Sequence, residues 1–225
     1  MLEILHEDNH LIIANKKCGD IVQGDKTGDK TLAEYVKDYI KVKYKKEGNV
    51  FLGIPHRLDR PTSGIVIFAR TSKALTRMNK IFAEKQIKKH YLAVVDKMPP
   101  KKTDTISHYL FRNTKQNKSY ASDLEKPNTK KGDLTYKFVS KSDRYFLLDI
   151  DLHTGRHHQI RAQLAQINCL IKGDLKYGFN RSNKDGGIHL HSYTAEFIHP
   201  VSNENIFVKA MPPKDPVWDF FMRKK

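Results

Sequence analysis

The part of this sequence best suited to chemistry is residues 56–64, which read His-Arg-Leu-Asp-Arg-Pro-Thr-Ser-Gly. Their only carboxylate, Asp59, stands between the guanidinium groups of Arg57 and Arg60. Neighbouring cations favour the ionised form of an acid, which is the form that acts as a base or a nucleophile. The alternative for a charged run of this kind is a salt-bridged turn without chemistry.

An apolar strand should hold this run in place. Residues 65–70, Ile-Val-Ile-Phe-Ala-Arg, are rich in β-branched side chains and follow directly after the turn-forming residues Thr-Ser-Gly. This pattern predicts a buried strand. Because a loop that leads into a core strand is held by that strand, we predict an active-site loop around Asp59.

Residues 56–64 match every fixed position of the active-site motif of RluA-type pseudouridine synthases, which is His-Arg-Leu-Asp, two variable positions, then Thr-Ser-Gly. Tyr91 lies in Lys-Lys-His-Tyr-Leu-Ala-Val-Val, which is similar to a second family strand. Residues 154–161, Thr-Gly-Arg-His-His-Gln-Ile-Arg, and residues 171–178, Ile-Lys-Gly-Asp-Leu-Lys-Tyr-Gly, resemble further landmarks in the family's order. The chain therefore resembles an RluA-type pseudouridine synthase over most of its length.

Some positions depart from the family pattern. Relatives commonly carry Pro, His, Gly and Pro where this sequence has Lys17, Gln163, Asn168 and Leu170. These positions lie outside the proposed reacting group. Relatives often also carry a small N-terminal RNA-binding domain, and we expect residues 1–225 to be the catalytic domain alone.

The resemblance implies isomerisation of specific uridines in ribosomal or transfer RNA to pseudouridine. Asp59 would be the catalytic carboxylate that lets uracil leave C1′, rotate and rejoin through carbon. Attack on the base, attack on the sugar and a glycal route all stay open. Arg161 would pair with Asp59, and Tyr91 would stack on the uracil and assist proton transfer.

The target nucleotide must leave the RNA stack, because no side chain reaches C1′ inside a helix. The resemblance implies that Arg57 fills the gap left in the stack and that Ile160 packs on the uracil ring. The residues expected to bind RNA or substrate are Arg57, His56, Arg60, Thr62, Ile160 and Arg156.

The composition is that of a globular domain with a polyanionic partner. The chain has 225 residues, 39% of them hydrophobic, and a formal net charge of +16. Such a charge favours RNA, so a non-catalytic RNA-binding protein on the same fold is the main alternative function. The two cysteines and the absence of a signal peptide or long apolar run predict a cytoplasmic protein without a membrane partner. We expect a monomer that needs no protein partner.

The hydrophobic patterns predict an α+β fold. We expect a largely antiparallel or mixed central sheet flanked by helices, with an active-site cleft across the sheet. A capping box at Thr31, a cap at Ser72, a core stripe in residues 160–167 and Asp215-Pro216 predict helices. Residues 101–132 are polar and predict an irregular or hairpin excursion, which is either solvated or in contact with RNA.

Two other kinds of site have some support in the sequence. A zinc site would draw on His153, His157, His158 and Cys169, or on His189 and His191. A hydrolase would use His56 with Asp59, but the sequence lacks a nucleophile elbow and an evident second carboxylate. It also lacks a glycine-rich phosphate loop, so nucleotide cofactors are not implied. We expect a reaction that needs no cofactor and no metal.

Overall fold

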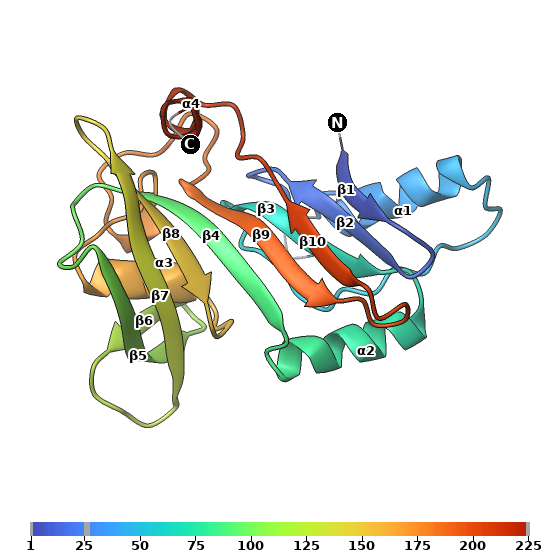
Figure 1. Ribbon diagram of the computed structural model, residues 1–225, viewed down its shortest axis with the longest axis horizontal. Helices are drawn as coiled ribbons and strands as arrows, with labels where there is room; N and C mark the ends of the chain where they lie inside the picture. Colours follow the sequence, from blue (N-terminus) through green and yellow to red (C-terminus); the bar gives the residue numbers. More distant parts are fainter. Residues whose placement is uncertain (1, 25–27, 224–225) are drawn as a thin grey trace. The chain divides into compact units, whose positions relative to one another are not determined.

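The computed structural model describes residues 2–24 and 28–223, and the chain divides into two compact units. The first unit contains residues 1–88 and 192–211, and the second contains residues 89–191 and 212–225. Each unit combines antiparallel strands with helices (Figure 1). This confirms the predicted α+β class with a largely antiparallel sheet. That residues 1–225 work as one catalytic domain stays a prediction.

The first unit is built on antiparallel strands with an apolar core. Its strands are β1 (Glu3–Glu7), β2 (Leu11–Lys16), β3 (Ser63–Ala69), β9 (Leu190–Ile198) and β10 (Asn205–Lys209), and its helices are α1 (Leu32–Lys43) and α2 (Ser72–Ala83). β2 pairs with β1 and with β3, while β10 pairs with β9. All seven residues of β3 are buried, as the run of β-branched side chains predicts. The loop that bears Asp59 therefore leads into the core of this unit.

The helix caps of this unit explain where its helices begin. Thr31 and Glu34 form the predicted capping box at α1, each side chain bonding to the backbone N–H of the other residue. The cap of α2 is Thr71, not Ser72 as the sequence predicted. Thr71 has an extended backbone and its hydroxyl accepts from the N–H of Ala74, whereas Ser72 is already the first helical residue.

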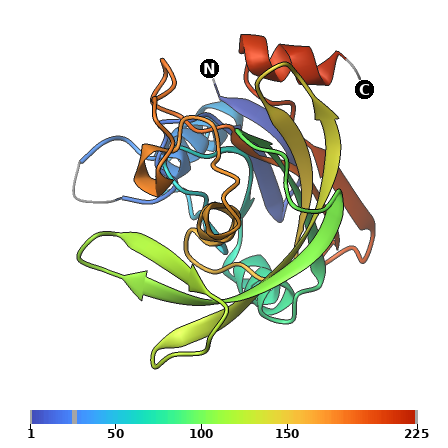
Figure 2. The ribbon, with the colours of Figure 1, turned by 90° about the vertical axis from the view of Figure 1, so that its left-hand side faces the viewer.

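The second unit is a curved antiparallel sheet in the order β4-β8-β7-β5-β6. Its strands are β4 (Ile87–Val95), β5 (Thr103–Asn113), β6 (Lys118–Ser122), β7 (Thr129–Lys141) and β8 (Phe146–Leu152), and its helices are α3 (Gln159–Gln166), the short 3₁₀ helix η1 (Leu175–Tyr177) and α4 (Pro216–Met222). Figure 2 shows α3 end on, against the inner side of these strands. Leu110, Ala162 and Tyr177 form an apolar cluster between the sheet, α3 and η1.

The polar stretch from residue 101 to 132 is a hairpin and not an irregular loop. β5 pairs with β6 on one side and with β7 on the other. The inward side chains Ile106, His108 and Leu110 are buried, while their neighbours along β5 are more exposed. No helix within the described residues has the length and apolar character that crossing a membrane requires.

Candidate active site

The loop that carries Asp59 is tied to the end of β2 by a buried lysine. The Nζ of Lys16 donates to the carbonyl oxygens of Lys17 at 2.8 Å, Arg60 at 3.0 Å and Thr62 at 2.7 Å. Lys16 is 1% exposed, so these three carbonyl oxygens take the place of the water that would hydrate its ammonium group. Two of the three carbonyl groups belong to the predicted active-site loop.

Burial lowers the pKa of Lys16 to about 8, and the negative groups of Asp20, Cys18 and Asp59 oppose this shift. The backbone of the loop is closed further by a hydrogen bond from the N–H of Thr62 to the carbonyl oxygen of Asp59 (3.0 Å). Asp59 thus sits on a short turn whose carbonyl groups are held by a cation.

His56 fixes the start of the same loop. Its Nε2 accepts a hydrogen bond from the backbone N–H of Ile67 on β3 at 2.9 Å. Its ring stacks on Phe82 of α2, with ring centroids 4.7 Å apart and an interplanar angle of 28°. These contacts give His56 a structural role, because they hold the loop to β3 and α2. A role of His56 in binding RNA or substrate stays a prediction.

The Thr-Ser-Gly end of the motif has a steric reason. Gly64 has φ +114, and a Cβ atom there would lie 2.2 Å from the carbonyl oxygen of Ser192 on β9. Only glycine combines this backbone conformation with so close an approach. Thr62 is 2% exposed, and within residues 2–24 and 28–223 its Oγ1 has no hydrogen-bond partner.

The two arginines of the motif have different surroundings. The side chain of Arg57 is exposed. Arg60 forms an ion pair with Asp29, with 2.8 Å between Nη2 and Oδ2, and both side chains are about half exposed. Adjacency in sequence to Asp59 therefore does not decide where the guanidinium group of Arg60 points.

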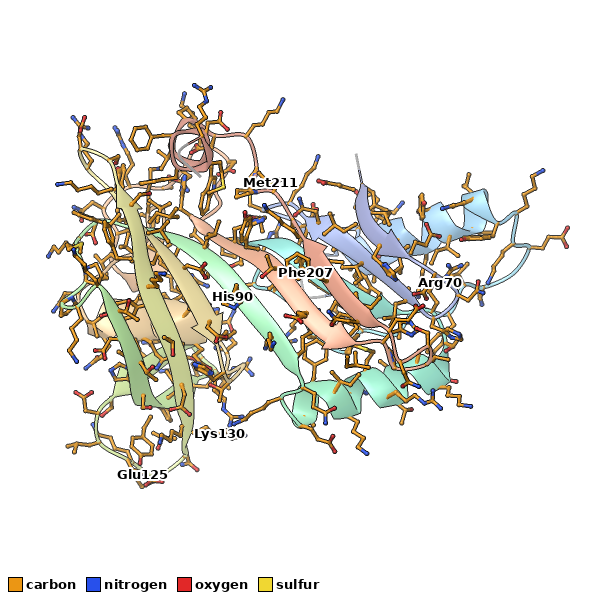
Figure 3. The ribbon with its side chains drawn as sticks, viewed as in Figure 1. Arg70, His90, Glu125, Lys130, Phe207 and Met211 are labelled. Carbon is orange, nitrogen blue, oxygen red and sulfur yellow. The ribbon has the colours of Figure 1, made fainter. Side chains whose placement is uncertain are left out.

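Tyr91 lies on β4 of the second unit, opposite Ile150 on β8. It is 7% exposed. Because side chains alternate along a strand, its neighbour His90 points to the other face, where it bonds to Asp149 at 2.9 Å (Figure 3). Tyr91 is therefore on the face of β4 opposite to the pair formed by His90 and Asp149.

Arg161 lies on α3 and makes buried polar contacts through all three of its guanidinium nitrogens. Its Nε and Nη2 donate to the two carboxylate oxygens of Asp174 at 2.7 and 2.8 Å. Its Nη1 lies 3.2 Å from Nε2 of His158, and its guanidinium carbon is 5.0 Å from the ring centre of Tyr177. Arg161 is 4% exposed and Asp174 is 2% exposed, so this is a buried ion pair with bidentate geometry.

The side chains around α3 include the other predicted binding residues. Ile160 is 5% exposed, at the start of the helix. Arg156 is exposed, and its Nε donates to the carbonyl oxygen of Lys131 while its N–H donates to Oε1 of Gln159. The predicted residues thus form two groups, one on the Asp59 loop of the first unit and one on α3 and β4 of the second.

Sequence reasoning did not assign the structural roles of four residues in these groups. Lys16 read as part of a polar turn, although it follows five residues of a buried strand. Asp174 and Tyr177 lie in the stretch Gly-Asp-Leu-Lys-Tyr-Gly, which resembled the family but had no assigned role. His158 adopts a left-handed backbone (φ 52) just before α3, and burial, together with Arg161, lowers its pKa to about 2.

The histidines proposed for zinc bind other groups. His157 contacts Ser119 through Nδ1 and Asn117 through Nε2, and His158 contacts Tyr177 and Arg161. Among the residues that the structure describes, no group of three or more His, Cys, Asp or Glu side chains has the arrangement of a metal site.

The fold is that of pseudouridylate synthases. The solved structure of human RNA Pseudouridylate Synthase Domain Containing 4 matches it with a TM-score of 0.80 at 20% identity, over 99% of this chain and 93% of that one. A family model described as RNA pseudouridylate synthase matches residues 10–166, more than half of the chain. The chain therefore belongs to the RNA pseudouridylate synthase family, as the motif in residues 56–64 predicted.

Two relatives illustrate the range of names within the family. Ribosomal large subunit pseudouridine synthase C of Buchnera aphidicola subsp. Acyrthosiphon pisum is 33% identical over 92% of this chain and 66% of its own length. tRNA pseudouridine synthase C of Haemophilus influenzae is 31% identical over 93% of this chain and 92% of its own length. The chain thus spans just under two thirds of the first relative and nearly all of the second.

Proposed function

We propose that this protein isomerises specific uridines in ribosomal or transfer RNA to pseudouridine, without a metal or a cofactor. The observation that carries the proposal is the complete motif in residues 56–64, held in a rigid loop by Lys16 and His56. An exposed arginine beside a carboxylate on such a loop suits a reaction on an extruded nucleotide. Relatives named for ribosomal and for transfer RNA support both substrate classes.

In this proposal Asp59 is the catalytic carboxylate. It lets the bond between N1 of uracil and C1′ break, and after rotation of the base a bond from C1′ to carbon replaces it. Arg161 pairs with Asp59 and orients it, since a planar guanidinium group can bond both carboxylate oxygens. Tyr91 stacks on the uracil and its hydroxyl assists the final proton transfer.

The same proposal assigns the contacts to RNA. Arg57 takes the place of the extruded nucleotide in the stack, and Ile160 packs against the uracil ring. Arg60, Arg156 and the wider surface charge of +16 attract phosphate groups. His56 and Thr62 act by shaping the loop. We further propose that residues 1–225 act as one catalytic domain in a cytoplasmic monomer, with structured RNA as the only partner that the reaction requires.

The test is pseudouridine mapping across total RNA from cells that lack the protein, with wild type and Asp59→Asn each restored. The expected result is a position that loses pseudouridine and regains it with wild type alone. Purified protein on the matching unmodified transcript should convert the same position. The Asp59→Asn variant should bind that transcript within about tenfold of wild type, because the amide keeps the shape of the acid.

Two results would count against the proposal. If purified Asp59→Asn protein, verified by mass, converts the transcript as wild type does, Asp59 is not the catalytic group. If wild type binds RNA but converts no position in cells or on transcripts, the protein is an RNA-binding protein on the pseudouridine synthase fold.

A further inference from the structure

We propose that Asp174 is a positioning residue of the reaction, which fixes the guanidinium plane of Arg161, the group that the proposed function pairs with Asp59. This inference rests on the proposed function. It concerns a buried acid that the sequence motif for the chemistry does not contain.

The first support is the shape of the ion pair. Asp174 accepts from Nε and from Nη2 of Arg161, which lie on the same side of the guanidinium group. Two parallel hydrogen bonds prevent rotation of the plane, which a single bond would allow. Because both side chains are nearly fully buried, water cannot replace either bond.

The second support comes from counting hydrogens around His158. The hydroxyl of Tyr177 donates its only hydrogen to the carbonyl oxygen of Ser119 and accepts from the N–H of the same residue, each at 2.9 Å. Nδ1 of His158 lies 3.0 Å from that hydroxyl oxygen, so Nδ1 must carry the hydrogen of this bond. Nε2 of the neutral ring is then an acceptor, and it faces Nη1 of Arg161.

The Nε, Nη1 and Nη2 atoms of Arg161 are therefore held by two acceptors whose own positions are fixed. The ring of Tyr177 lies against the guanidinium group, 5.0 Å from centre to carbon, and limits movement out of the plane. A positive His158 would repel Arg161, and the lowered pKa of His158 agrees with a ring that stays neutral.

The backbone of residues 173–178 places Asp174 and Tyr177 next to Arg161 on α3. Gly173 has φ +89 and Gly178 has φ +103, so the left-handed backbone at both ends suits glycine. A Cβ atom on Gly173 would also lie 2.5 Å from Nδ2 of Asn183. Between the two glycines, η1 is a single 3₁₀ turn that starts after Asp174 and ends at Tyr177. The pattern Gly-Asp-Leu-Lys-Tyr-Gly thus places an acid and a ring at Arg161.

The experiment compares single-turnover conversion of a substrate transcript by wild type, Asp174→Asn and Asp174→Glu. Asparagine keeps the shape of the side chain but loses the charge. Its NH₂ group would replace one acceptor oxygen, so that two hydrogen-bond donors would face each other at Arg161. We expect the rate constant to fall about 100-fold, with the dissociation constant for RNA within about threefold, because a misaimed group costs rate more than binding. Glutamate keeps the charge but moves the carboxylate by one methylene, so we expect a fall of about tenfold.

The control is Asp215→Asn in the same unit. Asp215 bonds to the buried His189 at 2.9 Å and caps α4, and it is not part of the proposed reaction. Its loss should lower the melting temperature as well, but leave the rate constant within about threefold at temperatures where the protein is folded. An equal loss of rate in Asp215→Asn would mean that destabilisation explains both variants, and the proposal would be wrong.

A second comparison uses Arg161→Lys. Lysine cannot form the two parallel bonds, so adding Asp174→Asn to Arg161→Lys should lower the rate by less than about threefold more. Independent, multiplying effects would place the action of Asp174 elsewhere and overturn the inference. If Asp174→Asn does not fold, the rate of Asp174→Glu decides, and a wild-type rate in that variant would overturn it.

The outcomes separate this inference from the function on which it rests. Active wild type, inactive Asp59→Asn and fully active Asp174→Asn would leave the proposed function standing and defeat the role of Asp174. Wild type without conversion of any uridine would defeat the proposed function, and the inference with it.

Discussion

The Nζ of Lys16 lies 2.7 Å from the carbonyl oxygen of Thr62, which joins the end of β2 to the loop that bears Asp59. The same ammonium group holds the carbonyl oxygen of Arg60, so the loop is bonded on both sides of Pro61. Burying a cation is costly, and here three backbone carbonyl oxygens replace the water around the ammonium group. Lys16 therefore stabilises the loop by contacts that only a long cationic side chain can make.

Replacing Lys16 by methionine should weaken both the fold and the reaction. Methionine is similar in length but leaves the carbonyl groups of Lys17, Arg60 and Thr62 without this donor. We expect the free energy of unfolding in urea to fall by about 2 kcal/mol and the rate of conversion to fall about tenfold, because the loop loosens. The exposed neighbour Lys17 is the control, and Lys17→Met should change stability by less than about 0.5 kcal/mol. Equal stability of the two variants would contradict the role of Lys16.

Replacing Gly64 by alanine should prevent normal folding. The added Cβ would lie 2.2 Å from the carbonyl oxygen of Ser192, and φ +114 is strained for any other residue. We expect a loss of at least about 3 kcal/mol in unfolding free energy, measured by urea denaturation. Gly48→Ala is the matched control, since Gly48 has φ +76 and its Cβ would meet nothing within 4 Å. Its expected loss is about 1 kcal/mol, so similar losses at both positions would show that the close approach does not matter.

Acid should destabilise the protein through His158 before its carboxylates titrate. Burial lowers the pKa of His158 to about 2, below the ordinary value of 6.5, so the unfolded chain binds a proton that the folded chain refuses. This contribution to stability is fully present above pH 6.5 and is lost as the pH falls below that value. We expect His158 to contribute about 1 kcal/mol per pH unit to the slope of unfolding free energy between pH 6 and pH 5.

The measurement is urea unfolding of wild type and His158→Gln at intervals between pH 7 and pH 5. The variant should show the shallower slope of unfolding free energy against pH. Burial also lowers the pKa of His108, His189 and His199, so both proteins should keep part of this pH dependence. His153→Gln, at an exposed histidine of the same unit, is the control for the substitution itself. Parallel curves for wild type and His158→Gln would contradict the assignment.

How far the sequence predicted the site differs from residue to residue. The loop around Asp59 and the strand β3 follow from local signals, since a motif, a turn and an apolar run adjoin in the chain. The core stripe in residues 160–167 predicted the helix that carries Arg161 but not the burial of this side chain, which is 4% exposed because β5, β6 and η1 pack around α3. Helical spacing describes one helix and carries no information on strands that pack on its other faces.

Lys16 and Asp174 show the same limit for charged groups. A lysine at a strand end and an acid in a turn are most often solvated, and local patterns predict that outcome. Their burial depends on partners 13 to 46 residues away, Arg161 for the acid and the carbonyl oxygen of Thr62 for the lysine. Such pairs arise from the tertiary fold, which composition and periodicity do not encode directly.

Affinity for RNA should fall steeply with salt. The formal net charge of +16 predicts binding through phosphate groups. Such binding releases counterions from the RNA, and added salt makes this release less favourable. For about four phosphate contacts on single-stranded RNA, the slope of log affinity against log salt should be about −3. Filter binding of one transcript between low and physiological salt measures this slope. Asp59→Asn is the control for the site, because it leaves the phosphate contacts intact and should give the same slope. An affinity that does not change with salt would contradict binding through phosphate groups, and RNA recognition would then depend on contacts to bases.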